Sequence, residues 1–137
     1  MLAKANRITS ADDYRRVVRR GAKVAGAHTV SYVRSRESGT DARFGFIVSK
    51  KVGTAVRRNL VRRRLKAAGH EVIADGARGF DLVVRALPSA ASAEFSSLRD
   101  EVRRAAVRGA ALPPSRPVTP PEAAVSRRNV REEASGA

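Results

Sequence analysis

The stretch from Lys50 to Lys66 restricts what this chain can fold into, because it holds eight cationic side chains, one asparagine and no acid. At about 100° per residue, an α-helix from about Ala55 gathers the polar residues of this stretch on one broad face. That face holds Arg58, Asn59, Arg62, Arg63 and Lys66. The rest of the helix surface is mostly apolar. Its apolar residues are Val56, Leu60, Val61, Leu65 and Ala68. The sequence therefore predicts an amphipathic helix whose polar face is cationic.

The cations of this helix have no acidic partner nearby in the sequence. Like charges one turn apart on a helix repel, and glutamates at that spacing normally offset the repulsion. Here the first acid is Glu71, after the cationic face has ended. The missing anions are therefore expected on another molecule, and a polyphosphate chain supplies them at high density. The net charge of +15 agrees, because it is typical of a nucleic-acid-binding protein.

Composition excludes several other classes of protein. No cysteine is present, so the chain has no disulfide, no thiolate metal site and no cysteine nucleophile. The first residues lack the apolar core of a signal peptide, and no apolar run reaches membrane-spanning length. The simplest expectation is a cytoplasmic protein with no membrane partner. Its length of 137 residues fits one small domain.

The first part of the chain predicts a helix followed by two strands. A helix capped by Ser10 or Asp12 is expected to run to Gly21. Residues that favour β-structure over 23–36 predict one strand, and residues 43–51 predict a second, more buried one. Because the loop between them is short and polar, the two strands are expected to pair as a hairpin.

The basic helix is then expected to begin at Thr54, as its N-cap, and to end at Gly69. Residues 79–87 predict a third buried strand, and apolar residues at helical spacing predict a final helix near 92–108. The expected order is α-β-β-α-β-α. It describes an α/β (α+β) sandwich with one sheet and helices packed on it.

The composition changes near Gly109. Residues 110–137 are rich in proline, alanine and serine and have too little apolar material to build a core. This tail carries four cations and three acids, so nearly all of the net charge belongs to the residues before it. The sequence predicts a folded RNA-binding domain over 1–109 and a disordered tail over 110–137.

The segment FGFIVSKKVGTAVRRNLVRRRLK, residues 44–66, resembles the signature region of the bacterial ribonuclease P protein subunit. Members of that family show a strand ending in V(S/A)KK, a glycine, and a helix with the motif R-N-R-x-(K/R)-R-x-x-R. The resemblance extends outward through ANRITSADDYRRVVRRG and GFDLVVRALPSA, and it covers about residues 4–108. One departure lies inside the motif, where the family has arginine and this chain has Leu60.

The resemblance implies a fold like domain 2 of ribosomal protein S5, with an unusual left-handed β-α-β crossover around the basic helix. It also implies a subunit of an endoribonuclease that removes the 5′ leader of precursor tRNA, with no small-molecule substrate. The residues implied to bind the ribonuclease P RNA are Lys50, Arg58, Asn59, Arg62, Arg63 and Lys66. Those implied to form a cleft for the single-stranded leader are Tyr14, Val18, Tyr32 and Lys51.

The residues themselves leave some of these roles open. Tyr14 and Tyr32 either stack on leader bases or pack in the core with their hydroxyls in water. Leu60 is expected to pack inward, so no RNA contact is carried over to it. Arg57 and Arg64 lie at apolar angles, where they either reach RNA from the flank or extend past the edge of the core.

No catalytic constellation is evident in the chain. His28 and His70 lie in unrelated segments without an acid to orient either ring, and Asp12 with Asp13 is better explained by helix capping than by metal binding. The protein is therefore expected to carry no catalytic residue and no metal site. Hydrolysis is expected to depend on Mg²⁺ ions that the RNA binds.

Two other functional classes remain compatible with a small basic α/β protein. The first is a ribosomal or other structural RNA-binding protein, which would sediment with ribosomal particles at high salt. The second is sequence-independent DNA binding, which would favour duplex DNA over tRNA that carries a leader.

Overall fold

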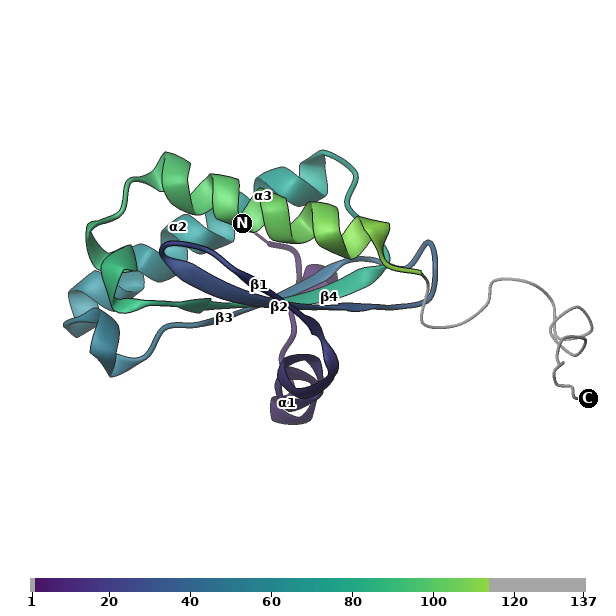
Figure 1. Cartoon of the computed structure of the whole chain (residues 1–137), viewed down its shortest axis with the longest axis horizontal. Coiled ribbons are helices and arrows are strands. Elements are labelled where there is room, and N and C mark those ends of the chain that lie inside the picture. The colour runs from purple at the N-terminus through teal and green to yellow at the C-terminus, as the bar shows by residue number, and fades with distance from the viewer. Residues whose placement is uncertain (1, 114–137) are drawn as a thin grey trace, which may run out of the picture.

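The computed structural model of the chain describes residues 2–113. The helices and strands are α1 (Ala11–Arg20), β1 (Ala22–Ala25), β2 (Thr29–Ser35), β3 (Arg43–Ile47), α2 (Ala55–Ala74), β4 (Phe80–Ala86) and α3 (Phe95–Ala111). Short 3-10 turns lie at Lys4–Asn6, Lys50–Val52 and Pro88–Ser92. Figure 1 shows α2 and α3 on one side of a single sheet and α1 alone on the other side. The predicted sandwich is confirmed, with one strand more than expected.

The sheet has the strand order β1-β2-β4-β3. β3 pairs in parallel with β4, and the other two pairings are antiparallel. The predicted hairpin between residues 23–36 and 43–51 is wrong, because β4 lies between β2 and β3. Residues 23–36 instead span most of two strands, which turn back on each other as the β1–β2 hairpin.

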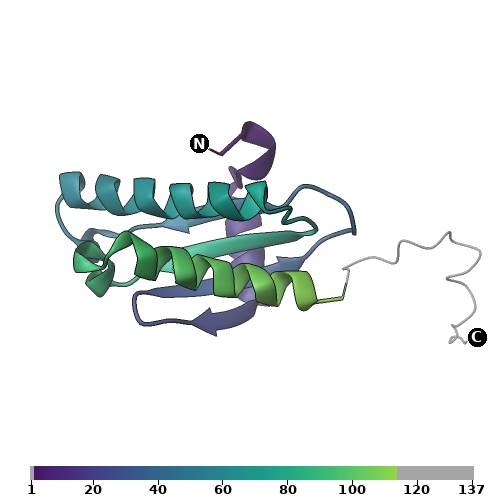
Figure 2. The same ribbon diagram turned by 90° about the horizontal axis from the view of Figure 1, so that it is seen from above.

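The connection from β3 through α2 to β4 is left-handed. In Figure 2, which looks down on the helices with the sheet behind them, β3 and β4 run in the same direction, from right to left. With the strands turned to point upward and the helix in front, β4 lies to the left of β3, whereas the common right-handed crossover places it to the right. This crossover confirms an expectation that came only from the family resemblance.

Each face of the sheet packs against helices through alternate residues. On the side of α2 and α3, Phe80, Leu82 and Val84 of β4 belong to the main core, which also contains Phe44 and Leu98. On the side of α1, the buried core is much smaller and comprises Ile8, Val17 and Val83. The fold therefore has a large core beneath two helices and a thin one beneath α1.

Side chains cap the helices as the sequence predicts, with one exception. The Ser10 hydroxyl accepts hydrogen bonds from the backbone N–H groups of Asp12 and Asp13, and the Thr54 hydroxyl accepts one from Arg57 at 3.3 Å. Gly69 was expected to end the basic helix, but this prediction is wrong. It is buried inside α2, where an added Cβ would lie 3.4 Å from the rings of Phe44 and Phe46. The glycine lets α2 lie close to β3.

The N-terminal arm covers the free edge of β3. The backbone N–H of Ile8 donates to the carbonyl of Phe44 at 2.9 Å, and Arg7 forms a parallel bridge with the same residue. At the other end, α3 continues to Ala111, past the boundary expected at residue 109. The predicted disorder of the tail concerns residues that lie outside the described part, apart from 110–113. No helix in residues 2–113 is both long enough and apolar enough to cross a membrane.

Candidate RNA interface

The outward side of α2 carries most of the predicted RNA-binding residues. Val61, Leu65, Ala68 and Val72 are buried against the sheet, which turns the opposite side of the helix to solvent. A shallow hollow on that exposed side is lined by Val56, Asn59, Arg62, Arg63 and Lys66. Arg58 lies at the start of the helix, where its Nε donates to the carbonyl of Gly53 at 3.3 Å.

The cations of this region stand without acidic partners. Within residues 2–113, no ion pair involves any of the eight cations between Lys50 and Lys66. Arg62 instead donates from Nη1 to the Oδ1 atom of Asn59 at 2.9 Å. Because arginine only donates, this contact fixes the Asn59 oxygen toward Arg62 and leaves the amide N–H groups free to donate outward. The surface is thus rich in hydrogen-bond donors and positive charge.

Leu60 and Val56 lie differently from the sequence expectation. Val56 is 82% exposed, and Leu60 is only half-buried and belongs to neither core cluster. Leu60, which was expected to pack inward, is therefore only partly covered, because the buried side of α2 is centred on Val61 and Leu65. An exposed valine therefore lies among the cations of the hollow.

Arg57 and Arg64 hold the loop between β4 and α3. Their Nη1 atoms donate to the backbone carbonyls of Ala91 at 3.1 Å and Ala93 at 3.0 Å, respectively. Both residues therefore do more than extend past the core, because each satisfies a carbonyl of the loop. The rest of each guanidinium group remains available.

A separate cleft lies on the other side of the sheet, beside α1. Its volume is about 490 Å³, and its lining comprises Tyr14, Arg15, Val18, Arg19, Ile47 and Arg85. Tyr14 and Val18 thus lie where the family resemblance places them. Tyr32 adjoins the cleft, because it packs in the same apolar cluster and lies beneath Arg85, whose guanidinium carbon is 5.6 Å from the ring centroid.

Tyr14 packs against the sheet and also lines the cleft. Its ring packs directly on Gly45, where an added Cβ would lie 2.5 Å from the ring, so only glycine allows this contact. Its hydroxyl accepts a hydrogen bond from the backbone N–H of Phe46 at 3.3 Å. The Tyr14 side chain is therefore half-buried against the sheet and also forms part of the cleft wall.

Lys50 and Lys51 were assigned to the end of a strand, and this assignment is wrong. β3 ends at Ile47, and both lysines lie in the 3-10 turn Lys50–Val52 with their side chains exposed. Lys51 does not line the cleft beside α1. Its predicted contact with a leader therefore lacks support from the position of the residue.

Sequence reasoning missed Arg85, which points into the cleft from β4. The whole segment 79–87 was interpreted as a buried strand. However, Val84 and Ala86 face the main core, so strict alternation places Arg85 on the opposite face. The available signal in the sequence was an arginine between two apolar residues of a strand, because alternation turns it to the face opposite its neighbours.

The two acids in the first turn of α1 pair with arginines. Asp12 pairs with Arg15, and Asp13 pairs with Arg16 and Arg43. Among the described residues, no three histidine, aspartate or glutamate side chains lie close enough to hold a metal ion.

Comparison with known proteins identifies the family. The family model described as Ribonuclease P matches residues 2–109. The ribonuclease P protein component of Clavibacter michiganensis subsp. michiganensis is 43% identical over 108 residues, covering 79% of this chain and 96% of that protein. The chain belongs to the ribonuclease P protein family. It is thus similar to subunits of an endoribonuclease holoenzyme that processes the 5′ end of tRNA, and the predicted family, fold and subunit role are confirmed.

Further relatives in the ribonuclease P protein family agree. The component from Pseudarthrobacter chlorophenolicus is 44% identical over 101 residues, covering 74% of each chain. The solved Staphylococcus aureus RNase P protein is 27% identical with a TM-score of 0.67, covering 79% of this chain and 97% of that one. The RNase P protein from Thermotoga maritima, 23% identical with a TM-score of 0.64 over 74% of this chain and 96% of that one, shows the shared fold. Family membership implies an RNA partner in a ribonucleoprotein and does not favour the ribosomal alternative.

Proposed function

We propose that the protein binds ribonuclease P RNA with the exposed side of α2 and the 5′ leader of precursor tRNA with the cleft beside α1. The observation that carries the first half is the set of eight cations without an acidic partner in residues 2–113. Two such cations at adjacent turns present guanidinium groups suited to bidentate phosphate contacts. The residues assigned to this contact are Lys50, Arg58, Asn59, Arg62, Arg63 and Lys66.

The second half rests on the chemistry of the cleft. Tyr14 and Tyr32 offer aromatic rings, on which single-stranded bases stack without regard to sequence. Arg19 and Arg85 line the same cleft and pair with no acid among the described residues. A cleft with aromatic walls and unpaired arginines suits a flexible, negatively charged strand. We therefore add Arg85 to the predicted leader-binding residues.

The two surfaces lie on opposite sides of the sheet but approach each other around the edge of β3. A hollow at this edge is lined in part by Tyr14 from α1 and by Arg62 and Lys66 from α2. Tyr14 also lines the leader cleft, and both cations also line the α2 hollow. A continuous path thus supports the binding of RNA and leader by one molecule.

In this proposal the chain holds two polyanions together and performs no bond-breaking step itself. Mg²⁺ ions bound by the RNA would activate water and stabilise the leaving oxygen. The protein lowers the electrostatic cost of bringing leader and RNA together. The cytoplasmic location predicted from the sequence remains part of the proposal.

Reconstitution with ribonuclease P RNA tests the proposed function. Cleavage of precursor tRNA is measured as Mg²⁺ is titrated, with RNA alone, protein alone and the mixture. We expect the mixture to cleave at Mg²⁺ concentrations where RNA alone is slow, because protein cations replace part of the screening by metal ions. Unchanged cleavage at low Mg²⁺ would refute the proposal, and the protein alone is expected to cleave nothing.

Replacing Tyr32 by alanine is expected to weaken binding of precursor tRNA about tenfold and to leave mature tRNA unaffected, because base stacking on a ring is worth about 1–3 kcal/mol. The measurement is the dissociation constant of the holoenzyme for both tRNAs. Tyr32→Phe is the control, since it keeps the ring and should bind as the unchanged protein does. Equal losses for both tRNAs would contradict the placement of Tyr32 beside the leader.

A further inference from the structure

α1 is attached to the sheet by few apolar contacts. It is the one helix on its side of the sheet within the described residues, and Val17 is its sole fully buried residue. The apolar cluster beneath it has three buried members, whereas the core under α2 and α3 has twenty. Burial alone therefore constrains the position of α1 less than that of the other helices.

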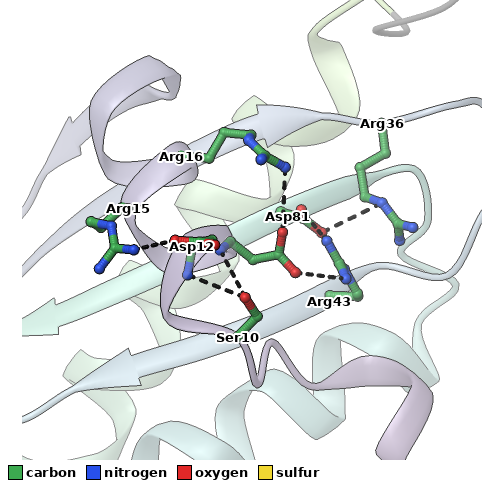
Figure 3. A network of polar contacts seen from close by, with 8 residues as sticks. Ser10, Asp12, Arg15, Arg16, Arg36, Arg43 and Asp81 are labelled. Atoms are coloured by element: carbon green, nitrogen blue, oxygen red, sulfur yellow. Dashed lines mark hydrogen bonds and ion pairs between the residues drawn. The ribbon is translucent and has the colours of Figure 1, made fainter.

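A cluster of ion pairs supplies a second attachment for α1, and Figure 3 shows it from close by. Arg43 of β3 donates to both oxygens of Asp81 of β4, from Nε at 2.8 Å and from Nη2 at 2.7 Å. Its remaining nitrogen, Nη1, reaches Asp13 of α1 at 3.5 Å. Arg16 joins the cluster through Asp13 at 3.5 Å, and Arg36 joins through Asp81 at 3.6 Å.

This cluster is partly withdrawn from water. Asp81 is only 6% exposed, and three-quarters of the Arg43 side chain is covered. The hydrogen bonds to Asp81, together with the charges of Asp81 and Asp13, raise the pKa of Arg43 despite the opposing effect of burial. A planar guanidinium held by two parallel bonds has a fixed direction, so its third contact with Asp13 is directional as well.

The sheet places this cluster and the leader cleft on opposite flanks of α1. Three successive rows of neighbouring residues cross the face that α1 covers. The rows are Arg34–Asp81–Arg43, then Tyr32–Val83–Gly45, then Val30–Arg85–Ile47. The helix packs on the middle row through Val17 and Tyr14, which leaves the ionic row on one flank and the cleft row on the other.

We propose that Asp13, Arg43 and Asp81 are positioning residues that set the width of the leader cleft by fixing where α1 lies across the sheet. The inference rests on the proposed function of that cleft. α1 lies between the ionic row and the cleft. If α1 shifts away from the ionic row, the cleft narrows, and if α1 shifts toward that row, the cleft widens. The contact between Arg43 and Asp13 sets this position.

A comparison of Asp13→Asn with Asp12→Asn tests the proposal. The two acids are adjacent in the first turn of α1, and both variants remove one negative charge and keep the backbone bonds to Ser10. Asp12 pairs with Arg15 of the same helix and forms no ion pair with the sheet within residues 2–113. We expect Asp13→Asn to lower the preference of the holoenzyme for precursor over mature tRNA about fivefold, the size expected for a partly exposed ion pair. Asp12→Asn should retain the preference.

A second variant keeps the test decisive if Asp13→Asn lowers the folded fraction. Arg43→Lys retains a cation beside Asp81, but one ammonium group cannot hold both oxygens of Asp81 and also reach Asp13. It should reduce the preference for precursor tRNA while binding of ribonuclease P RNA through α2 stays unchanged. That split distinguishes positioning from general loss of structure, which would weaken both.

The outcomes separate this inference from the proposed function. If the unchanged holoenzyme shows no preference for precursor tRNA, the leader cleft itself is wrong and the positioning role falls with it. If that preference is present but Asp13→Asn and Arg43→Lys both retain it, the cleft stands and the positioning role is refuted.

Discussion

Replacing Arg62 and Arg63 together by alanine is expected to lower the affinity for ribonuclease P RNA about 20-fold at 0.15 M salt. Each cation that neutralises a phosphate releases counterions, so two lost contacts flatten the slope of log K against log salt by about 1.4–1.8. Both side chains line the hollow on α2, and neither pairs with an acid in residues 2–113. Binding titrations from about 0.1 to 0.5 M salt measure the slope.

A matched pair on α3 controls for net charge. Arg104 and Arg108 are exposed cations without an ion pair in the described part of the chain, so replacing both by alanine removes the same charge. This double variant is expected to leave the slope nearly unchanged, because neither residue lies on the α2 hollow. If both double variants flatten the slope of log K against log salt equally, RNA binding depends on overall charge, and the assignment of the RNA contact to α2 would be wrong.

Sequence patterns predicted well the features that depend on neighbouring residues. The N-caps Ser10 and Thr54, the strand near residues 79–87 and the unpaired cations of α2 follow from short-range rules of capping, alternation and charge. In each case, the residues that decide the structure lie within a few positions of one another. The prediction that Gly69 ends α2 failed because packing against Phe44 and Phe46 outweighs the local preference of glycine.

Strand pairing depended on distant residues, and there the sequence misled. A short polar loop between residues 35 and 43 favoured a hairpin, but β4 begins at Phe80 and inserts between the two strands. β4 pairs with β2 over seven residues and with β3 over five, and these long-range pairings leave no local signal in the loop. The left-handed crossover depends both on that insertion and on the face that α2 covers, and only the family resemblance anticipated it.

The positions of the candidate residues were predicted only in part. Arginines on the outer side of α2 and aromatic residues beside α1 lie where they were expected. The exposure of Val56 and the partial burial of Leu60 were not foreseen, because periodicity does not show how far neighbouring elements extend around a helix. The loop that Arg57 and Arg64 contact on the flank of α2 lies about thirty residues later in the sequence.

Replacing Glu101 by alanine is expected to lower the free energy of unfolding by about 3 kcal/mol, because buried donors would lose a charged acceptor. Glu101 lies on α3 and is only 7% exposed. Its carboxylate accepts hydrogen bonds from the backbone N–H of His28, at 3.1 and 3.2 Å, and from the Thr29 hydroxyl at 2.6 Å. Urea unfolding, with the midpoint compared at constant m-value, measures the loss.

The turn between β1 and β2 is shaped around this carboxylate. At Gly26, an added Cβ would clash with the carboxylate of Glu101, so glycine is needed for the turn to close over the acid. The neighbouring Asp100 is exposed and pairs only with Arg99, at 3.7 Å, among the described residues. Asp100→Ala is therefore the control, and its expected loss is below about 0.5 kcal/mol.

Glu101→Gln separates the hydrogen bonds from the charge. The amide oxygen still accepts one of the bonds, so this variant should lose less stability than Glu101→Ala but more than Asp100→Ala. Such an order would identify the carboxylate as the group that ties the β1–β2 turn to α3. If Glu101→Ala and Asp100→Ala unfold at the same urea concentration, the turn is held by its backbone bonds alone, and the buried acid contributes nothing to the fold.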